Sequence, residues 1–133
     1  LDEYIKLINK IKNEFQADKN KISIIGFSHG CYGIVNLIPK YPKYFSAVVP
    51  IGCNTGYASS FIYQPVWTFV GTGEGHKTMP GFVSTINKKG GSAKHTSVKH
   101  KYANHNILGD KYSILRDKEY NVIEWMISKT KKS

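Results

Sequence analysis

Cysteine, arginine and long apolar runs are all scarce in this 133-residue chain. Cys31 and Cys53 are too few for a disulfide framework. Both are expected to be small buried apolar residues, and a bridge between them is an alternative that the pattern does not favour. No apolar run approaches the roughly 20 residues that cross a bilayer, so no membrane span is expected. Residues 1–4 show neither the basic segment nor the apolar run of a signal peptide, which slightly favours a cytoplasmic location but leaves it undecided.

Positive charge is abundant, but it comes almost entirely from lysine. The formal net charge is +10, and a basic balance of this kind can serve nucleic acid or another anionic surface. Arg116 is the only arginine, whereas base recognition favours arginine forks. The lysines are dispersed except at residues 129–132. The lysines are therefore expected to lie on a solvated surface, without a nucleic-acid partner. A basic module that binds anions or nucleic acid is a less favoured alternative.

Apolar and aromatic residues, at 41% and 13%, are present in the amounts of a folded protein, and the length predicts one domain over residues 1–133. Helical and strand-like patterns alternate along the chain. Helices are predicted at 1–15, 29–39, 82–89 and 111–129, and strands at 21–27, 45–52, 66–70 and 94–100. This alternation predicts an α/β fold with a doubly wound, mostly parallel sheet of about four strands. Active sites of such sheets lie at the carboxyl ends of the strands.

The most informative segment is Gly26-Phe27-Ser28-His29-Gly30, between the first predicted strand and the helix that follows it. A G-x-S-x-G sequence in this context is typical of a sharp turn whose glycines remove Cβ atoms that would clash. The turn is expected to strain the backbone of Ser28 and to hold its hydroxyl beside the free N–H groups of a helix. Ser28 is therefore predicted to be a nucleophile, and the alternative is a structural glycine–serine turn.

A serine nucleophile needs a base, and the base needs an orienting carboxylate. Glu74 follows the third predicted strand and His105 follows the fourth, which gives the chain order serine, acid, histidine. His95 and His100 lie inside the fourth predicted strand, where side chains point across the sheet. We therefore predict His105 as the base and Glu74 as the acid.

Other assignments of the acidic and histidine side chains are less favoured. Glu74 has the alternative of a solvated loop carboxylate, Asp110 comes after His105, and Asp117 is expected on a helix face. His76 shares a loop with the proposed acid and does not easily reach over it. A metal site is discarded because spacings of five put the middle histidine on the opposite face, and no cysteine or carboxylate cluster completes the set (His95, His100, His105).

Several segments together resemble an α/β-hydrolase of the esterase branch, which includes polyhydroxybutyrate-depolymerase-like, dienelactone-hydrolase-like and phospholipase/carboxylesterase-like proteins. They are the elbow at 26–33, the lead into the next strand at 41–50, the strand at 65–71, Met79-Pro80, His105-Asn106 and the final helix around Trp125. The resemblance implies a serine carboxylic-ester hydrolase that forms an acyl-enzyme on a small-molecule ester, with no metal or organic cofactor. Ser28 would be the nucleophile, His105 the base, Glu74 the acid, and the backbone N–H of His29 an oxyanion donor.

This sequence departs from the family pattern at three places. Glu74 stands where the family usually has aspartate, and Cys31 replaces the usual second glycine of the elbow. The early strands of the family, with the loop that supplies its second oxyanion N–H, have no counterpart here. The strand at 21–27 is therefore expected to be an exposed sheet edge, suited to self-association or to a missing N-terminal segment. The runner-up interpretation is a catalytically impaired hydrolase remnant that binds a partner through this edge.

Overall fold

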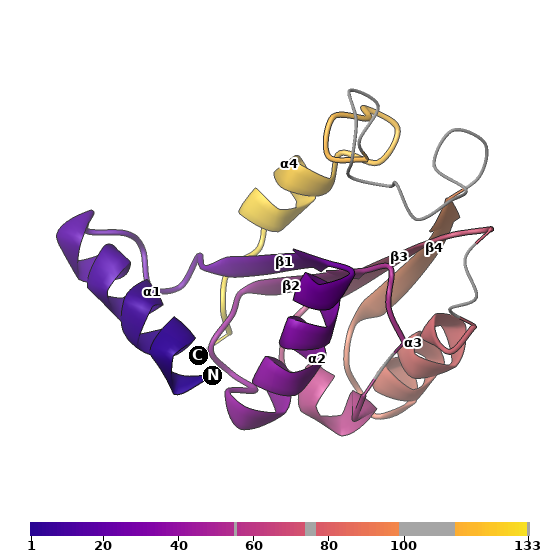
Figure 1. Cartoon of the computed structure of the whole chain (residues 1–133), viewed down its shortest axis with the longest axis horizontal. Coiled ribbons are helices and arrows are strands. Elements are labelled where there is room, and N and C mark those ends of the chain that lie inside the picture. Colours follow the sequence, from indigo (N-terminus) through magenta and orange to yellow (C-terminus); the bar gives the residue numbers. More distant parts are fainter. Residues whose placement is uncertain (55, 74–76, 99–113, 133) are drawn as a thin grey trace.

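The protein is described by a computed structural model that covers residues 1–54, 56–73, 77–98 and 114–132. Its centre is a parallel sheet in the order β1-β2-β3-β4, formed by Ser23–Phe27 (β1), Ala47–Ile51 (β2), Val66–Gly71 (β3) and Ala93–Val98 (β4). The helices are Asp2–Glu14 (α1), His29–Lys40 (α2), the 3₁₀ turn Ala58–Phe61 (η1), Met79–Lys88 (α3) and Val122–Ile127 (α4) (Figure 1). The predicted parallel α/β architecture is confirmed.

The four strands differ in how deeply they are buried. Every residue of β2 and β3 is buried, as expected for parallel strands that are covered on both faces. Every residue of β1 is only half-buried, and β1 ends the sheet on one side. Within the described residues, the prediction that this strand forms an edge is confirmed.

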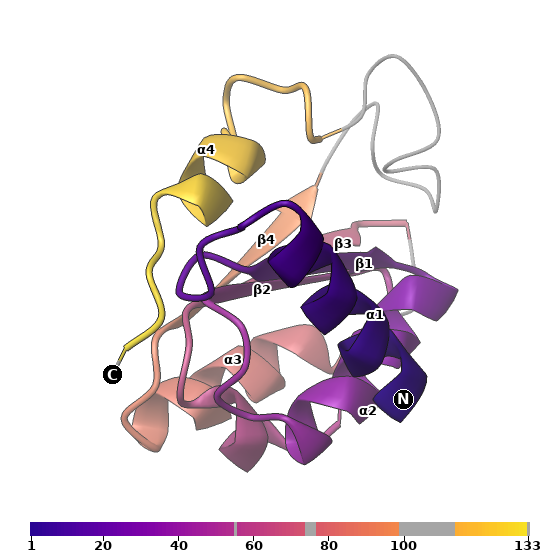
Figure 2. The same ribbon diagram turned by 90° about the vertical axis from the view of Figure 1, so that its left-hand side faces the viewer.

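Two apolar clusters hold helices on the two faces of the sheet (Figures 1 and 2). The larger cluster joins α2, η1 and α3 to one face, and its fully buried members include Ile34, Ile38, Phe45, Val48, Phe61 and Ile86. The smaller cluster joins α4 and the turn before it to the other face through Val49, Ile51, Phe69, Ile114 and Val122. None of the helices in the described ranges has the length and hydrophobicity that a bilayer crossing requires.

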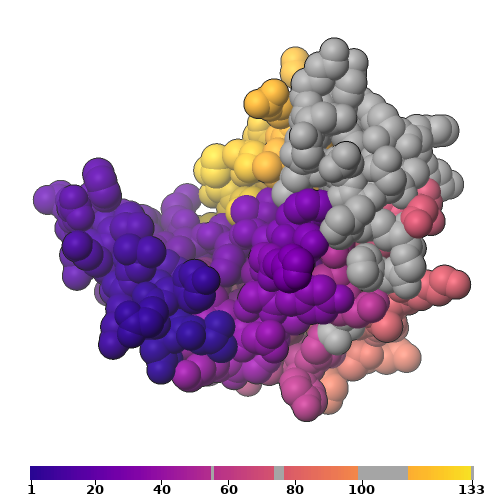
Figure 3. Space-filling model, in the orientation of Figure 1, coloured from indigo at the N-terminus to yellow at the C-terminus, as the bar shows by residue number. Residues whose placement is uncertain are grey.

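Helix α1 lies beyond the β1 edge, and most of its apolar side is uncovered. Ile5 is its only buried residue, whereas Leu7 and Phe15 are 54% and 72% exposed. In the space-filling view α1 projects as a lobe from one side of the molecule (Figure 3). The predicted amphipathic helix is present, but the part of the sheet described here does not reach under its whole apolar side.

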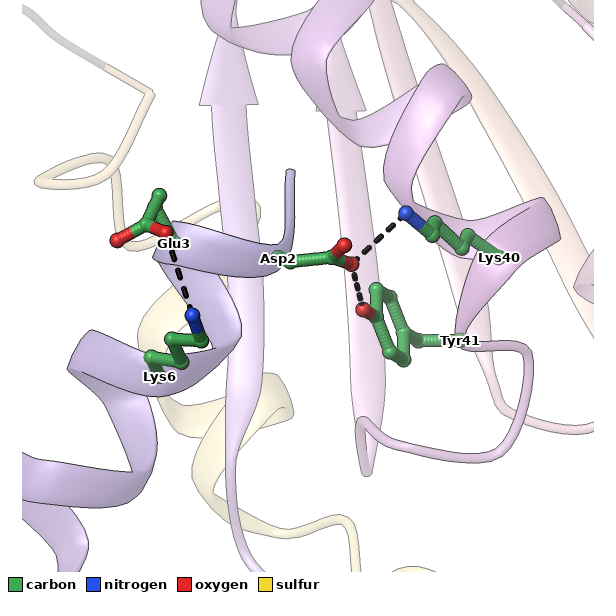
Figure 4. A network of polar contacts seen from close by, with 5 residues as sticks. All are labelled: Asp2, Glu3, Lys6, Lys40 and Tyr41. Carbon is green, nitrogen blue, oxygen red and sulfur yellow. Dashed lines mark hydrogen bonds and ion pairs between the residues drawn. The ribbon is translucent and has the colours of Figure 1, made fainter.

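A polar contact fixes the start of α1 to the end of α2 (Figure 4). The Asp2 carboxylate accepts a hydrogen bond from the Tyr41 hydroxyl, and Lys40 Nζ lies 2.8 Å from the same carboxylate oxygen. The hydrogen bond from Lys40, followed by that from Tyr41, lowers the pKa of Asp2 to about 2. Asp2 and Lys40 are solvent-exposed and Tyr41 is partly buried, so this contact orients α1 more than it stabilises the protein.

The predicted long final helix is wrong over much of its length. Residues 114–120 lie in turns, and within the described part of the predicted helix, 114–129, only Val122–Ile127 is helical. Asp117 lies in these turns rather than on a helix face, and its carboxylate accepts a hydrogen bond from the Glu119 backbone N–H at 3.0 Å. Side chains of this type compete with helical hydrogen bonds. Asn121, in a left-handed conformation with φ 51°, then precedes α4.

Candidate active site

Ser28 occupies the strained turn that its sequence context predicts. Its backbone has φ 54° and ψ −113°, in a region that non-glycine residues rarely adopt. The Ser28 N–H donates to the Ile51 carbonyl at 2.9 Å, and the Ser28 carbonyl accepts from the Tyr32 N–H at 3.1 Å. These bonds tie the turn to β2 on one side and to the first turn of α2 on the other. They hold a conformation that costs on the order of 1–3 kcal/mol.

The two glycines of the motif have different roles. A Cβ on Gly26 would lie 2.4 Å from the carbonyl oxygen of Gly30 and 2.9 Å from Ile34 Cδ1, so a larger residue does not fit. A Cβ on Gly30 would meet no described atom within 4 Å. Among the described residues, the prediction that both glycines avoid a clash is correct for Gly26 and wrong for Gly30. The backbone of Gly30 makes the close approach to Gly26, and no described atom lies near the position of a Cβ on Gly30.

The carboxyl ends of the four parallel strands lie together at one end of the sheet. This end is distinct from the lateral edge that β1 forms. The residue directly after each of three strands donates its N–H to a carbonyl at or near the end of the next strand: Ser28 to Ile51 at 2.9 Å, Gly52 to Phe69 at 2.9 Å, and Thr72 to Val98 at 3.0 Å. The described ends of all four strands therefore lie at the end of the sheet where Ser28 lies.

Several residues predicted from the sequence lie outside the described residues. They include the proposed acid and base, Glu74 and His105, and the competing side chains His76, His100 and Asp110. The described chain stops short of the acid at Gly73, just after β3, and short of the base at Val98, the end of β4. The roles of Glu74 and His105 stay predictions.

His95 is held across the sheet, as its position in a strand predicts. Its Nδ1 lies 2.7 Å from the Thr68 hydroxyl, and its Nε2 lies 3.1 Å from the Ser97 hydroxyl. Burial lowers the pKa of His95 below its ordinary value of 6.5. Both ring nitrogens thus contact hydroxyls within the sheet, which leaves His95 an unsuitable partner for Ser28.

Cys31 and Cys53 form a disulfide, contrary to the favoured expectation of two separate thiols. Their Cα atoms are 5.9 Å apart and both side chains are fully buried. The sequence contained part of the signal for this pairing, but the strand register that completes it comes from the structure. Each cysteine comes shortly after the carboxyl end of a predicted strand, and the ends of these strands, Phe27 and Ile51, are register partners. The bridge fastens the helix that follows Ser28 to the segment that follows β2.

An apolar groove of about 370 Å³ opens beside the turn, between α1, β1 and α2. His29 and Gly30 line it at the start of α2. The rest of its wall is almost entirely apolar and consists of Leu1, Tyr4, Ile8, Ile24, Ile25, Gly33, Ile34 and Leu37. No group of three or more potential metal ligands occurs among the described residues.

A solved structure shares this architecture. It is the crystal structure of a thermostable esterase, which matches 97% of this chain with a TM-score of 0.76 and 25% sequence identity. The fold is esterase-like. This chain corresponds to only 36% of the esterase chain. No protein-family model and no curated protein matches the sequence.

Proposed function

We propose that this protein is a serine hydrolase that cleaves carboxylic esters at Ser28. The observation that carries the proposal is the backbone of Ser28, strained between a parallel strand and a helix of an esterase-like fold. The backbone N–H of His29, the first residue of α2, is the proposed oxyanion donor.

The proposed reaction proceeds through an acyl-enzyme. The Ser28 oxygen attacks the ester carbonyl while His105 accepts the hydroxyl proton, and Glu74 orients the imidazole. The tetrahedral intermediate collapses as His105 protonates the departing alcohol. A water molecule, deprotonated by His105, then attacks the acyl group, and the serine leaves with the proton. No metal or organic cofactor takes part in these steps.

Two observations support the assignment of Glu74 and His105: the order of serine, acid and histidine along the chain, and the position of the carboxyl ends of β3 and β4. Glu74 and His105 follow β3 and β4 in the sequence, and the hydrogen bond between Thr72 and Val98 shows that these two strands end at the end of the sheet where Ser28 lies. Active-site residues of parallel α/β sheets gather at the carboxyl ends of the strands. His95, the main described competitor for the base, has both ring nitrogens engaged within the sheet.

A second candidate function is a hydrolase remnant that binds a partner through the edge of β1. It is favoured by the half-buried edge strand and by the uncovered apolar side of α1. In the family that the sequence resembles, a segment without a counterpart here supplies the second oxyanion donor. Self-association, or pairing with a further N-terminal segment, would cover the same edge.

A fluorophosphonate probe distinguishes the two functions, because it labels only an activated serine. Wild type is expected to be labelled, whereas Ser28→Ala is expected to fall to background. Ser59→Ala is the matched control, since Ser59 is an exposed serine in η1, and it should keep full labelling. A folded wild-type chain that resists the probe contradicts the hydrolase and favours the remnant.

Two further variants test the proposed base and acid. His105→Ala should slow labelling by about 10²–10⁴-fold, the usual contribution of general base catalysis. Glu74→Gln should also slow labelling, since the imidazole loses its orienting charge. If either variant reacts at the wild-type rate, that residue is not part of the triad. The substrate preference can then be measured from hydrolysis rates. The panel comprises p-nitrophenyl esters of increasing acyl length, with thioester and lactone substrates for comparison.

A further inference from the structure

Helix α1 and the residues at its two ends carry half of the large apolar and aromatic side chains that the described chain exposes. Five of these ten side chains are Leu1, Tyr4, Leu7, Ile11 and Phe15, with exposed fractions from 46% to 72%. Tyr4, Leu7 and Ile11 follow one another at intervals of three and four residues, so they form one stripe along the helix. Phe15 continues this α1 stripe at the helix end. A contiguous apolar patch of this kind marks an interaction surface, whereas apolar side chains exposed singly need no partner.

The α1 stripe points away from the protein, because the opposite side of the helix is held. Ile5 is buried in the larger core cluster, and Asp2 is held by the contact shown in Figure 4. Asn9 Oδ1 accepts a hydrogen bond from the Tyr44 hydroxyl at 2.6 Å. Residues 2, 5 and 9 repeat at intervals of three and four, as residues 4, 7 and 11 do. The two series differ by two positions, which is a turn of about 200° around an α-helix. The stripe therefore faces outward on the lobe that α1 forms (Figure 3).

The stripe adjoins the apolar groove between α1, β1 and α2, since Tyr4 belongs to both. The groove adds Ile8 from α1 and Ile24 and Ile25 from β1. None of the described residues that line it is acidic. Aliphatic side chains thus make up most of a surface that extends beyond one helix. Such side chains gain free energy when they enter hydrocarbon, whereas single-stranded nucleic acid is bound mainly through charge and aromatic stacking.

Positive charge borders this apolar surface. Lys10 is exposed one helical turn after the middle of the stripe, and Lys19 and Lys21 are exposed in the segment that follows α1. The Lys131 N–H donates to the Asn20 carbonyl at 2.7 Å, which brings the lysine-rich tail beside that segment. Between residues 10 and 21 the chain has four lysines and two acidic residues, and residues 129–132 add three lysines. The end of the stripe at Phe15 is therefore the more basic end.

We propose that the α1 stripe and its bordering lysines bind the surface of an anionic phospholipid bilayer. The stripe enters the boundary between headgroups and acyl chains, and the lysines reach the lipid phosphates. With 13 residues, α1 would lie along the interface. Charge decides between this occupant and a second copy of the chain. Two copies, each with a formal net charge of +10, repel one another, whereas an anionic bilayer attracts the same charge.

The test is co-sedimentation of the whole chain with vesicles of phosphatidylglycerol and phosphatidylcholine, compared with vesicles of phosphatidylcholine alone. We expect binding to the anionic vesicles that weakens as salt is added, and little binding to the neutral ones. Leu7→Ser should weaken binding about tenfold, whereas Ile127→Ser, at an exposed aliphatic residue of α4, should not. Lys10→Gln should weaken binding about fivefold. Lys89→Gln removes the same charge at the end of α3 and should change binding less than twofold.

A tryptophan in the stripe measures insertion directly. Leu7→Trp should gain blue-shifted emission on anionic vesicles and be quenched by lipids brominated in their acyl chains, whereas Ile127→Trp should show neither change. Equal binding to neutral vesicles, or equal effects of Leu7→Ser and Ile127→Ser, would overturn the proposal. A dimer in sedimentation equilibrium that Leu7→Ser dissociates would assign the stripe to a second copy and overturn it as well. Ser28→Ala should bind vesicles as wild type does, so this result is independent of the proposed hydrolase.

Discussion

At the scale of single residues, the conformation of Ser28 depends on what its neighbours lack. Gly26 has no Cβ, and this allows the carbonyl of Gly30 to pass where a side chain would otherwise lie. The start of α2 then packs closely on the end of β1. Backbone contacts therefore hold the turn that strains Ser28.

Gly26→Ala should disrupt this packing. The new methyl group overlaps a backbone carbonyl, so we expect a loss of about 1–3 kcal/mol in the free energy of unfolding, together with loss of probe labelling. Gly33→Ala is the matched control in α2, because its Cβ meets no described atom within 4 Å. It should be neutral or stabilising by up to about 1 kcal/mol, as alanine favours helix more than glycine does. Urea unfolding measures both variants, and equal stabilities would contradict the close-contact explanation.

His95 should make stability depend on pH. Burial lowers its pKa below 6.5 in the folded protein, so the unfolded chain binds the proton more readily. The stabilisation is fully present above pH 6.5 and declines as the pH falls from there toward the folded pKa.

The expected outcome is a smaller acid-induced loss of stability in His95→Gln than in wild type, measured by urea unfolding between about pH 8 and about pH 5. Ser97→Ala keeps the imidazole and should keep the wild-type pH dependence. Identical curves for wild type and His95→Gln would show that another group causes the acid sensitivity.

At the scale of elements, the strands and turns that depend on local sequence could be predicted. The β-branched runs of β2 and β3 identified buried parallel strands, and the G-x-S-x-G segment identified the strained turn before α2. The final helix was overpredicted because apolar spacing alone ignores Asp117, whose side chain supports a turn. The start of α3 was placed too late, since Met79 and Pro80 already form its first turn.

The disulfide joins two elements whose meeting depends on strand register, which single-segment patterns do not contain. It closes a loop with a sequence separation of 22 between α2 and the end of β2. The double variant Cys31→Ala/Cys53→Ala should lose about 3 kcal/mol of unfolding free energy by the loop-entropy argument. Probe labelling should slow as well, because α2 is less firmly held. Unfolding without reductant measures the loss, and two free thiols in denatured wild type would contradict the bridge.

At the scale of the whole molecule, the sheet is well covered at its centre and open at one side. β2 and β3 are enclosed by helices, whereas β1 carries a half-buried edge next to the uncovered side of α1. The candidate catalytic turn lies where the strands end, whereas the C-terminal tail returns to the residues before β1, where the Lys131 N–H donates to the Asn20 carbonyl. The path of this tail could not be predicted from its lysine-rich sequence.

Amide hydrogen exchange rates should distinguish the edge strand β1 from the covered strands β2 and β3. The amides of β2 and β3 are expected to exchange only through global unfolding, whereas the β1 amides that do not bond to β2 should exchange faster. At higher protein concentration the β1 amides should become protected if copies associate through this edge. Slow β1 exchange in a dilute monomer would show that the edge is already covered.

The bond between Cys31 and Cys53 also makes a covalent ring of the chain from the start of α2 to the segment after β2. Lys40, half-exposed at the end of α2, and the exposed Lys43 lie inside this ring and are natural points for trypsin. A single cut there opens the ring but releases no fragment. The nicked protein should therefore run as one species on a non-reducing gel and separate into two only after reduction.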